Sequence, residues 1–450
     1  MSISRTRGIT AAGMAGVAAL ALLLAGCAGS NSGSPSASAS ATESGALAAV
    51  KACGSGEDSS SVFALGSFLP LSGSLSYLVP PAVAGVGAAL SDINAAGGVN
   101  GKPACLSSQD SSDGDHKDVG DANIKSLVQS KVSAVVGPES STVTLNILPV
   151  TQAAGIPVFS PAATSDALSG QKHFFRDAAP NSAEGDALAK QILSDVPSAK
   201  VAILVFNDAY GIDLRNTLDA SLKAGGGTVT YGGKGMNQEF SSTESSFGTI
   251  VGNALATKPD VVAVIAFAQS ETIWQELASS GFKMSDTYYV DGNLADYSTS
   301  KNAGSDPDMT GAKGTLQGSD PAVIKDKLEA WYMKNVGKSL DGTYSYGAES
   351  YDATVILALA AELAGSNDPA AIEAQIRPVT GSTNGTECKS FKECKDLIAG
   401  GTKDIHYTGP SGIGQINDAG DPSTAYIGIY QADKLNLGKK LLTTVQATIG

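Results

Sequence analysis

Two serines have a spacing to lysine that could support nucleophilic catalysis. Ser169 precedes Lys172 by three residues, and Ser280 precedes Lys283 by three. In such a pair the lysine assists removal of the hydroxyl proton, and the serine oxygen attacks an acyl carbon. Enzymes of this class also need Ser-Asp-Asn and Lys-Thr-Gly segments, and the sequence contains neither. The sequence therefore favours a protein that is not an enzyme and has no catalytic residues. A secreted hydrolase is the weaker alternative.

Histidine and aspartate, which could hold a metal, lack the spacing for it. The three histidines are scattered along the chain, at His116, His173 and His406. An acidic cluster misses the spacing of a calcium loop and consists of Asp110, Asp113, Asp115 and Asp118. We expect these aspartates to cap a helix and to interact favourably with its dipole. Neither a metal nor a cofactor is predicted.

The N-terminus has the features of an export signal. Arg5 and Arg7 precede an apolar stretch over residues 9–26, which ends in Leu24-Ala25-Gly26-Cys27. Small residues suit signal peptidase cleavage, and these four residues resemble the bacterial lipobox, in which the cysteine thiol receives a diacylglycerol. We therefore expect a signal peptide over residues 1–26 and a lipid on Cys27. An uncleaved membrane helix is the alternative, because the stretch is barely long enough to span a bilayer.

Residues 27–58 are predicted to form a flexible, lipid-anchored linker. Between residues 28 and 47 the chain is rich in Ser, Ala, Gly and Thr, and Glu43 is its one charged residue. Such a segment cannot bury enough apolar surface to offset the entropy lost on ordering. The folded body is therefore expected outside the cell membrane and held to it by the lipid alone.

Composition excludes some classes of partner for the folded body. The chain has a formal net charge of −14 over 450 residues, with 42% hydrophobic and 16% charged residues. These are globular values, and so acidic a surface repels nucleic acid and anionic headgroups. No nucleic-acid partner is expected.

Four cysteines remain after Cys27, an even number in an oxidising compartment. Cys53 precedes the first expected strand and Cys105 lies in the second, so a bridge between these neighbours is sterically reasonable. Cys388 and Cys394 are close enough in sequence to close a small loop. A zinc site is the alternative, but it requires Cys-x-x-Cys spacing or nearby histidines, and neither is present.

Short β-branched runs alternate with amphipathic helical patterns from residue 62 onward. Such alternation predicts parallel sheets covered by helices on both faces. Two successive sets indicate an α/β protein with two doubly wound lobes. The expected strands are Val62–Phe68, Ala104–Gln109, Val132–Val136 and Ile156–Phe159 in the first set, and Val201–Phe206, Thr228–Tyr231, Val261–Phe267 and Tyr288–Val290 in the second.

The remaining chain indicates that the lobes are discontinuous in sequence. Helical patterns return at residues 323–336 and 351–363, and a hairpin is expected between 412–416 and 425–431 around a turn at 417–420. These segments imply three crossover strands, near residues 180, 310 and 405. The predicted lobes are 59–180 plus 311–404, and 181–310 plus 405–450.

Several segments, taken in order, resemble the leucine/isoleucine/valine-binding family of ABC importers. The resemblance covers residues 60–431 and implies the two-lobed periplasmic-binding-protein fold, type I, which closes on its ligand like a hinged trap. The segments are Gly66-Ser-Phe-Leu-Pro-Leu-Ser-Gly73, Asp92–Lys102, Val135–Ser141, Ser160–Thr164, Asp208–Gly211, Val290–Gly292 and Tyr351–Ala353.

The resemblance implies a ligand-binding surface on the first lobe. Ser141 would contact a ligand carboxylate through its hydroxyl and amide groups. Ala162, through its backbone, and Thr164, through its hydroxyl, would complete this anion site. Tyr77 or Leu78 would line the wall.

On the second lobe, the resemblance implies that Tyr210 covers the ligand, Phe267 supplies an aromatic wall and Asp291 holds an α-ammonium group. Simpler interpretations remain open. Ser141 and Thr164 would merely cap helices, Tyr210 and Phe267 would be core aromatics, and Asp291-Gly292 would form only a turn.

These features predict a monomeric receptor that delivers a small metabolite to an ABC permease, with a branched-chain or other amino acid as the first expectation. Pro80-Pro81 replaces residues that are usually polar or aromatic in relatives and stiffens that wall. A receptor of the same fold coupled to a signalling partner is the alternative.

Overall fold

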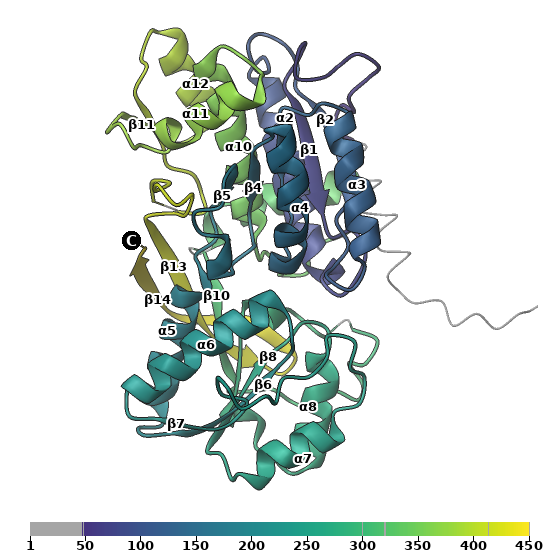
Figure 1. Ribbon diagram of the computed structural model, residues 1–450, viewed down its shortest axis with the longest axis vertical. Coiled ribbons are helices and arrows are strands. Elements are labelled where there is room, and N and C mark those ends of the chain that lie inside the picture. Colours follow the sequence, from purple (N-terminus) through teal and green to yellow (C-terminus); the bar gives the residue numbers. More distant parts are fainter. Residues whose placement is uncertain (1–46, 48, 299, 319–320, 413, 450) are drawn as a thin grey trace, which may run out of the picture. The chain divides into compact units, whose positions relative to one another are not determined.

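The computed structural model describes most of the chain from residue 49 onward (Figure 1). The end of the predicted flexible linker, residues 27–58, belongs to the fold, because Val50 is buried in a hydrophobic core and Cys53 forms a disulfide with Cys105. The expected signal peptide and Cys27 lie outside the described part. The described residues are 47, 49–298, 300–318, 321–412 and 414–449.

The first lobe is built on a five-stranded sheet with strand order β2-β1-β3-β4-β5. All its neighbouring strands pair in parallel. Three helices alternate with the early strands, as the sequence predicts: α2 (Val79–Ala95), α3 (Lys117–Gln129) and α4 (Ser141–Ala154). The strands are β1 (Ala64–Leu69), β2 (Cys105–Asp110), β3 (Ala134–Val136), β4 (Val158–Ser160) and β5 (Phe174–Arg176).

Alternating residues of these strands fill two different cores. Leu65 and Val136 pack with α2 and with α10 (Gly347–Ala364) on one face of the sheet. Phe68 and Val135 pack with α3 and α4 on the other face. Because successive strand residues point to opposite faces, an uninterrupted apolar run is what a sheet covered on both sides requires.

The second lobe is built on a seven-stranded sheet with order β14-β13-β10-β9-β8-β6-β7. Its covering helices are α5 (Asn181–Asp195), α6 (Ala209–Ala224), α7 (Gly248–Ala256) and α8 (Ser270–Ser279). The strands are β6 (Lys200–Val205), β7 (Thr228–Tyr231), β8 (Val261–Ile265), β9 (Thr287–Tyr289), β10 (Lys313–Gln317), β13 (Thr424–Asp433) and β14 (Asn436–Thr448).

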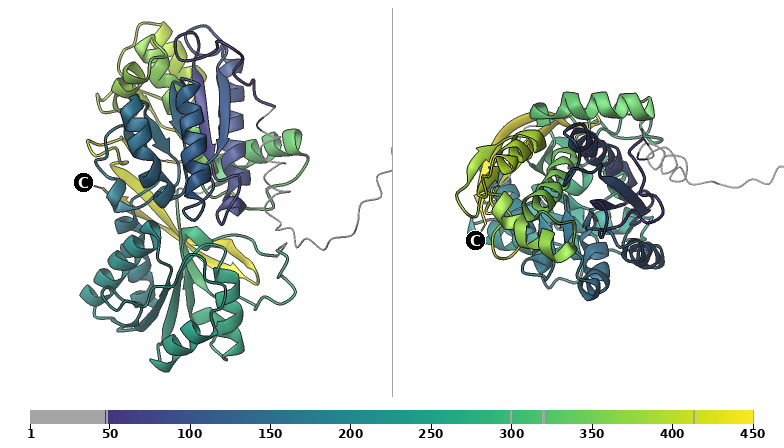
Figure 2. Two further views of the ribbon diagram at one scale, coloured as in Figure 1. Left: turned by 45° about the vertical axis from the view of Figure 1, so that its right-hand side comes forward. Right: turned by 90° about the horizontal axis from the view of Figure 1, so that it is seen from above.

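This sheet is mixed, and its C-terminal hairpin differs from the expected one. β13 pairs antiparallel with β10 and with β14, and the hairpin turns at residues 434–435; Figure 2 shows it as a long ribbon. The turn expected at 417–420 does form, and the residues beside it pair: Ile416 bridges Pro422, the Gly414 amide donates to the Thr424 carbonyl oxygen at 2.9 Å, and the Ser423 amide donates to the Gln415 carbonyl oxygen at 2.6 Å. The described residues of 412–416 nevertheless form no continuous strand, and the long hairpin lies further along the chain.

Two of the crossovers lie later in the chain than expected. The strand after residue 310, β10, pairs with β9 and β13 in the second sheet, so the chain leaves this lobe after Gln317. Ile416 still packs in a core of the first lobe, so the chain returns between residues 416 and 424. The crossover near residue 180 agrees with the start of α5.

The segment between these crossovers completes the first lobe. It contains α9 (Lys325–Val336), α10, α11 (Pro369–Val379), α12 (Phe391–Ala399), and the paired strands β11 (Thr386–Cys388) and β12 (Ile405–Tyr407). Both predicted disulfides are confirmed. Cys53 bonds to Cys105 and Cys388 bonds to Cys394.

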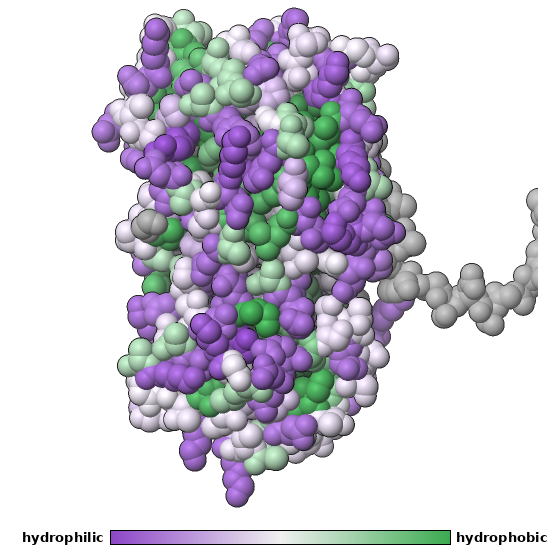
Figure 3. All heavy atoms as spheres, in the orientation of Figure 1, coloured by the Kyte–Doolittle hydropathy of each residue, from purple (hydrophilic) through white to green (hydrophobic). Residues whose placement is uncertain are grey.

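One described helix region, Ser76–Ala95, is apolar and long enough to cross a membrane by composition alone. Most of it is buried within the fold, where α2 packs against α10. Its apolar character therefore reflects core packing. On the face drawn in Figure 3, polar and apolar side chains are intermixed.

Candidate ligand-binding site

A small cavity of about 20 Å³ lies where the two lobes meet. It differs from larger hollows, such as one of about 410 Å³ beside Tyr77 and Tyr332, because buried acidic and phenolic groups line it. From the first lobe it is lined by Leu75, Leu78, Glu139, Ser141, Ala162 and Tyr346, and from the second by Tyr210, Phe267, Asp291 and Gly292.

Asp291 is the most densely hydrogen-bonded side chain at this cavity. It follows β9 at the start of a short 3-10 turn, Asp291–Asn293. Its Oδ1 accepts from the Tyr210 hydroxyl at 2.5 Å and from the Gly292 amide at 2.6 Å. Its Oδ2 accepts from the Tyr346 hydroxyl. Burial raises the pKa of Asp291, while these hydrogen bonds favour its charged form.

A second buried carboxyl group, Glu184 of α5, lies directly behind Asp291. Glu184 Oε1 accepts from the Asp291 amide at 3.1 Å and from the Thr315 hydroxyl at 2.6 Å. Burial, followed by repulsion from Asp291, raises the pKa of Glu184 well above its usual range. The two groups titrate as a pair, and the hydrogen bonds that Asp291 accepts from Tyr210, Tyr346 and Gly292 favour its charged form.

Aromatic rings form the second-lobe wall. Tyr210 lies in the first turn of α6, where the Asp208 side chain accepts from the Tyr210 amide at 2.9 Å and caps the helix. Its ring stacks on Phe267, with centroids 5.3 Å apart. A Cβ at Gly292 would lie 2.8 Å from the Tyr210 hydroxyl, so glycine is required beside these rings. The two aromatics are part of the core, and they also face the cavity.

The expected anion site on the first lobe is assembled only in part. Ser141 Oγ accepts from the amides of Thr164 at 3.2 Å and Ser165 at 3.1 Å. Ser140, not Ser141, caps α4 by accepting from the Val143 amide at 3.2 Å. Ser141 and Ala162 line the cavity. The buried Thr164 hydroxyl does not line it and has no hydrogen-bond partner among the described residues.

Tyr77 and Leu78 belong to a 3-10 turn, Ser76–Leu78, that leads into α2. Leu78 lines the cavity. Tyr77 lines the neighbouring hollow, and its hydroxyl donates to the Gly292 carbonyl oxygen of the second lobe.

Further hydrogen bonds connect the lobes around the cavity. The Thr142 hydroxyl donates to Asp208 at 2.6 Å, and the Ser165 hydroxyl donates to Asp213 at 3.0 Å. Together with the Tyr77 and Tyr346 contacts, they show that the cavity is closed between the lobes.

Sequence reasoning did not identify Leu75, Glu139, Gly292 or Tyr346 as cavity residues. Glu139 stands two residues before Ser141 in the segment that carries the resemblance. This closeness in sequence could have indicated that Glu139 also lies at the cavity. Tyr346 is 55 residues from its partner Asp291, and no local pattern connects them.

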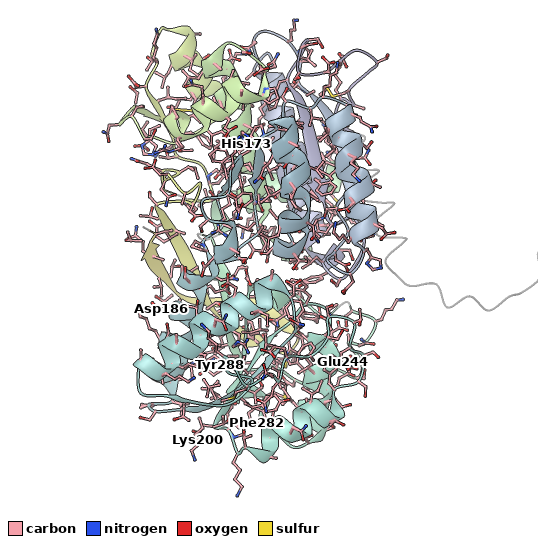
Figure 4. The ribbon with its side chains drawn as sticks, viewed as in Figure 1. His173, Asp186, Lys200, Glu244, Phe282 and Tyr288 are labelled. Carbon is pink, nitrogen blue, oxygen red and sulfur yellow. A yellow bond between two sulfur atoms is a disulfide. The ribbon has the colours of Figure 1, made fainter. Side chains whose placement is uncertain are left out.

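The serine and histidine side chains considered for other chemistry are placed elsewhere. Ser169 Oγ accepts from Arg176 at 2.8 Å, and Arg176 also pairs with Asp421. His173, labelled in Figure 4, pairs with Glu373 at 2.5 Å. His116 pairs with Asp113 at 2.6 Å. Among the residues that the structure describes, no group of three His, Cys, Asp or Glu side chains is arranged to hold a metal ion.

None of the four aspartates caps α3, although Asp118 lies in its first turn, where the expected interaction with the helix dipole is favourable. His116 occupies the N-cap position of α3 and makes no side-chain capping bond. Asp113 instead accepts from the Ser74 amide at 2.6 Å, and Asp110 accepts from the Ser72 amide at 3.1 Å. Because the loop before α2 folds over β2, its amides are nearer to these carboxylates than the α3 amides are.

Comparisons with known proteins agree with this architecture. A family model described as periplasmic binding protein matches residues 63–406. BasB of Halobacterium salinarum, a chemotactic signal transduction system substrate-binding protein, is 27% identical over 383 residues, which are 81% of this chain and 85% of that protein.

Solved structures show the same fold. Leucine-binding protein LivK from Thermotoga maritima has a TM-score of 0.67 at 21% identity, and the match covers 85% of this chain and 99% of that one. A solute-binding protein of an ABC transporter from Rhodopseudomonas palustris, in complex with p-hydroxybenzoic acid, has a TM-score of 0.69 at 16% identity, covering 86% of this chain and 98% of that one. The predicted two-lobed fold is confirmed.

Proposed function

The chain belongs to the periplasmic binding protein family, and we propose that it is the extracytoplasmic substrate-binding lipoprotein of an ABC importer. The observation that carries the proposal is the buried cavity between the lobes, with Asp291 on one side and Ser141 on the other. Its relatives and structural neighbours are named as solute-binding proteins, not enzymes.

Ligand capture follows from the arrangement of these groups. A molecule in the cavity would contact both lobes, so it would bind the closed form more tightly than an open one. That difference in affinity shifts the population toward the closed form. Exclusion of water on closure strengthens each polar contact, and an importer can then recognise the closed receptor.

The first ligand class to test is a small amino compound, beginning with amino acids. The Asp291 carboxylate would hold an ammonium group, with Tyr210 and Phe267 covering the apolar part. Ser141, at the first position of α4, would supply a hydroxyl and an amide for a polar group at the other end.

Attachment to the membrane is a further part of the proposal. The lipobox-like Leu24-Ala25-Gly26-Cys27 supports lipid on Cys27 as the protein's membrane attachment. A monomer that diffuses beside the membrane would then deliver its ligand to an ABC permease.

A second candidate function is ligand sensing. It is favoured by the similarity over 81% of the chain to BasB, which by name is part of a chemotactic signal transduction system. Both functions use the same cavity and differ in the partner that recognises the closed form. Deletion of this chain's gene would abolish uptake of the ligand if the chain serves an importer, and would abolish the cell's behavioural response to the ligand, with uptake intact, if it serves a sensor.

Binding is tested by stripping the protein of bound molecules through unfolding and refolding. Mass spectrometry of the released fraction identifies any small molecule that copurifies. Thermal unfolding is then followed with that molecule and with amino acids, and a ligand raises the Tm because it binds only the folded state. A protein that releases no small molecule and shows no thermal response would contradict the proposal.

A further inference from the structure

Glu139 is a buried acid at the cavity that the folded protein leaves without a partner. It follows β3 and immediately precedes Ser140, the N-cap of α4. The residue is 4% exposed, and neither Oε1 nor Oε2 has a hydrogen-bond partner among the described residues. A buried polar group without a partner is costly to folding and is often retained for binding.

The backbone holds Glu139 in place from the end of β3. Gly137 has a φ of 99°, and a Cβ there would lie 2.2 Å from the Phe68 carbonyl oxygen of β1. Only glycine fits this position. The turn that it forms directs the following residues, Glu139 and Ser141, into the cavity wall.

Among the described residues, the cavity lining contains carboxyl groups and no basic side chains. Glu139 and Asp291 both line it, and among the described lining residues none is Lys, Arg or His. Both carboxyl groups are near enough to act on the Tyr77 phenol, and after burial and the influence of Tyr297 they raise the pKa of that phenol further. An anionic ligand would find no basic side chain among these described lining residues to pair with.

Glu139 also changes what the N-terminus of α4 can bind. The positive end of a helix dipole attracts anions, and in the expected site that attraction would hold a ligand carboxylate. In its charged form, a carboxyl group one residue before the N-cap offsets this attraction. The aromatic rings of Tyr210 and Phe267 line the same cavity, and aromatic rings attract cations.

We propose that the ligand is a small organic cation with a net positive charge, whose charged nitrogen pairs with Glu139. This inference rests on the proposed receptor function and specifies the chemistry of its ligand. The closed cavity has a volume of about 20 Å³, close to the space of one water molecule, so the lobes must move apart to admit the ligand.

Burial raises the pKa of Glu139 to about 8 in the ligand-free protein. At pH 7 the group therefore holds a proton when the cavity is empty. A cation that enters displaces this proton and supplies the positive charge that Glu139 otherwise lacks.

Two matched pairs of probes test the charge directly in the wild-type protein, stripped of bound molecules. L-lysine and L-norleucine have similar chains and differ by a terminal ammonium group. Choline and 3,3-dimethylbutan-1-ol differ by a charged nitrogen in place of carbon. We expect calorimetric binding of the charged member of at least one pair, about 10- to 100-fold tighter than its neutral partner.

Glu139→Gln keeps the shape of the side chain and removes its charge. We expect it to weaken binding of the charged probe about tenfold or more while leaving the neutral probe unchanged. Glu349→Gln is the matched control, because Glu349 is equally buried but does not line the cavity. Circular dichroism establishes that both variants are folded.

Three results would overturn the inference while leaving the receptor function intact. In the first, the molecule that copurifies with the protein is neutral or anionic. In the second, the charged and neutral members of both probe pairs bind with equal affinity. In the third, the Glu139→Gln variant is folded and binds the charged probe with the same affinity as the wild-type protein. If the protein releases no molecule and binds no probe, the proposed function fails and the inference fails with it.

Discussion

The Tyr346 hydroxyl, at the start of α10 in the first lobe, donates a hydrogen bond to the Asp291 carboxylate at the end of β9 in the second. Asp291 also accepts from Tyr210, which belongs to its own lobe. In the proposed function the same carboxylate would both hold the lobes together and contact the ligand. Closure and recognition would then be coupled through Asp291.

Tyr346→Phe removes this hydrogen bond between the lobes while keeping the ring. Phenylalanine has the same backbone preferences at the φ of 60° found at Tyr346. We expect affinity for the copurifying ligand to fall by about 1 kcal/mol, the net value of one hydrogen bond, and small-angle scattering to show a larger open fraction without ligand. Tyr344→Phe, which changes a phenol outside the cavity, is the control. Equal scattering and affinity in both variants would contradict the coupling.

Asp291→Asn and Ser141→Ala test the two ends of the cavity. Each removes a polar group that we place against the ligand, and each is expected to weaken binding by about 1–3 kcal/mol. Isothermal titration calorimetry measures the loss. Unchanged affinity in both variants would show that the ligand binds elsewhere in the protein.

Affinity for a cationic ligand should rise with pH between about 6 and 8. Burial raises the pKa of Glu139 to about 8, so below that value each binding event releases a proton. One released proton corresponds to a change of about tenfold per pH unit. Calorimetry in two buffers with different ionisation enthalpies counts the released protons, and Glu139→Gln should remove the proton that Glu139 contributes.

The other titratable groups at the cavity do not remove this dependence. Burial raises the pKa values of Tyr77, Tyr210 and Tyr346 above their usual range, so these phenols stay neutral below pH 9. Burial also raises the pKa of Asp291, which acts in the same direction as Glu139. Affinity that falls as the pH rises would instead indicate that protonated Glu139 donates to an anionic ligand.

The two disulfides are expected to contribute unequally to stability. Cys53–Cys105 closes a loop over 52 residues, and Cys388–Cys394 closes one over 6. Chain-entropy estimates for these loops are about 4 and about 2 kcal/mol. Guanidinium chloride unfolding of the two double Cys→Ser variants measures both losses. A larger loss for the short loop would show that native-state contacts outweigh the entropy of the unfolded chain.

Cys27→Ser should release the protein from the membrane. The lipobox-like segment that ends in Cys27 supports lipid attachment through its thiol, and serine cannot form the thioether. Cell fractionation followed by immunoblotting should find the variant in the soluble extracytoplasmic fraction. A variant that stays with the membrane would favour an uncleaved helix over residues 9–26.

Local sequence was sufficient for most strands and helices. The apolar run Val261–Ile265 forms β8, and the apolar spacing from Val83 to Ile93 forms the buried face of α2. β10 was missed because Thr315 and Gln317 look exposed in sequence. In the structure both are buried, and both donate to Glu184, more than a hundred residues earlier in the chain.

The sequence alone indicated an exported α/β receptor with two lobes, two disulfides and the positions of Ser141, Tyr210 and Asp291. Those inferences rest on periodicity, cysteine placement and ordered short segments, all encoded by residues close together in the chain. The pairing of Tyr346 with Asp291, and the solitary position of Glu139 beside them, became apparent only when the lobes were packed together. Contacts at a closed cavity depend on which distant side chains share one buried space, and no local pattern records that.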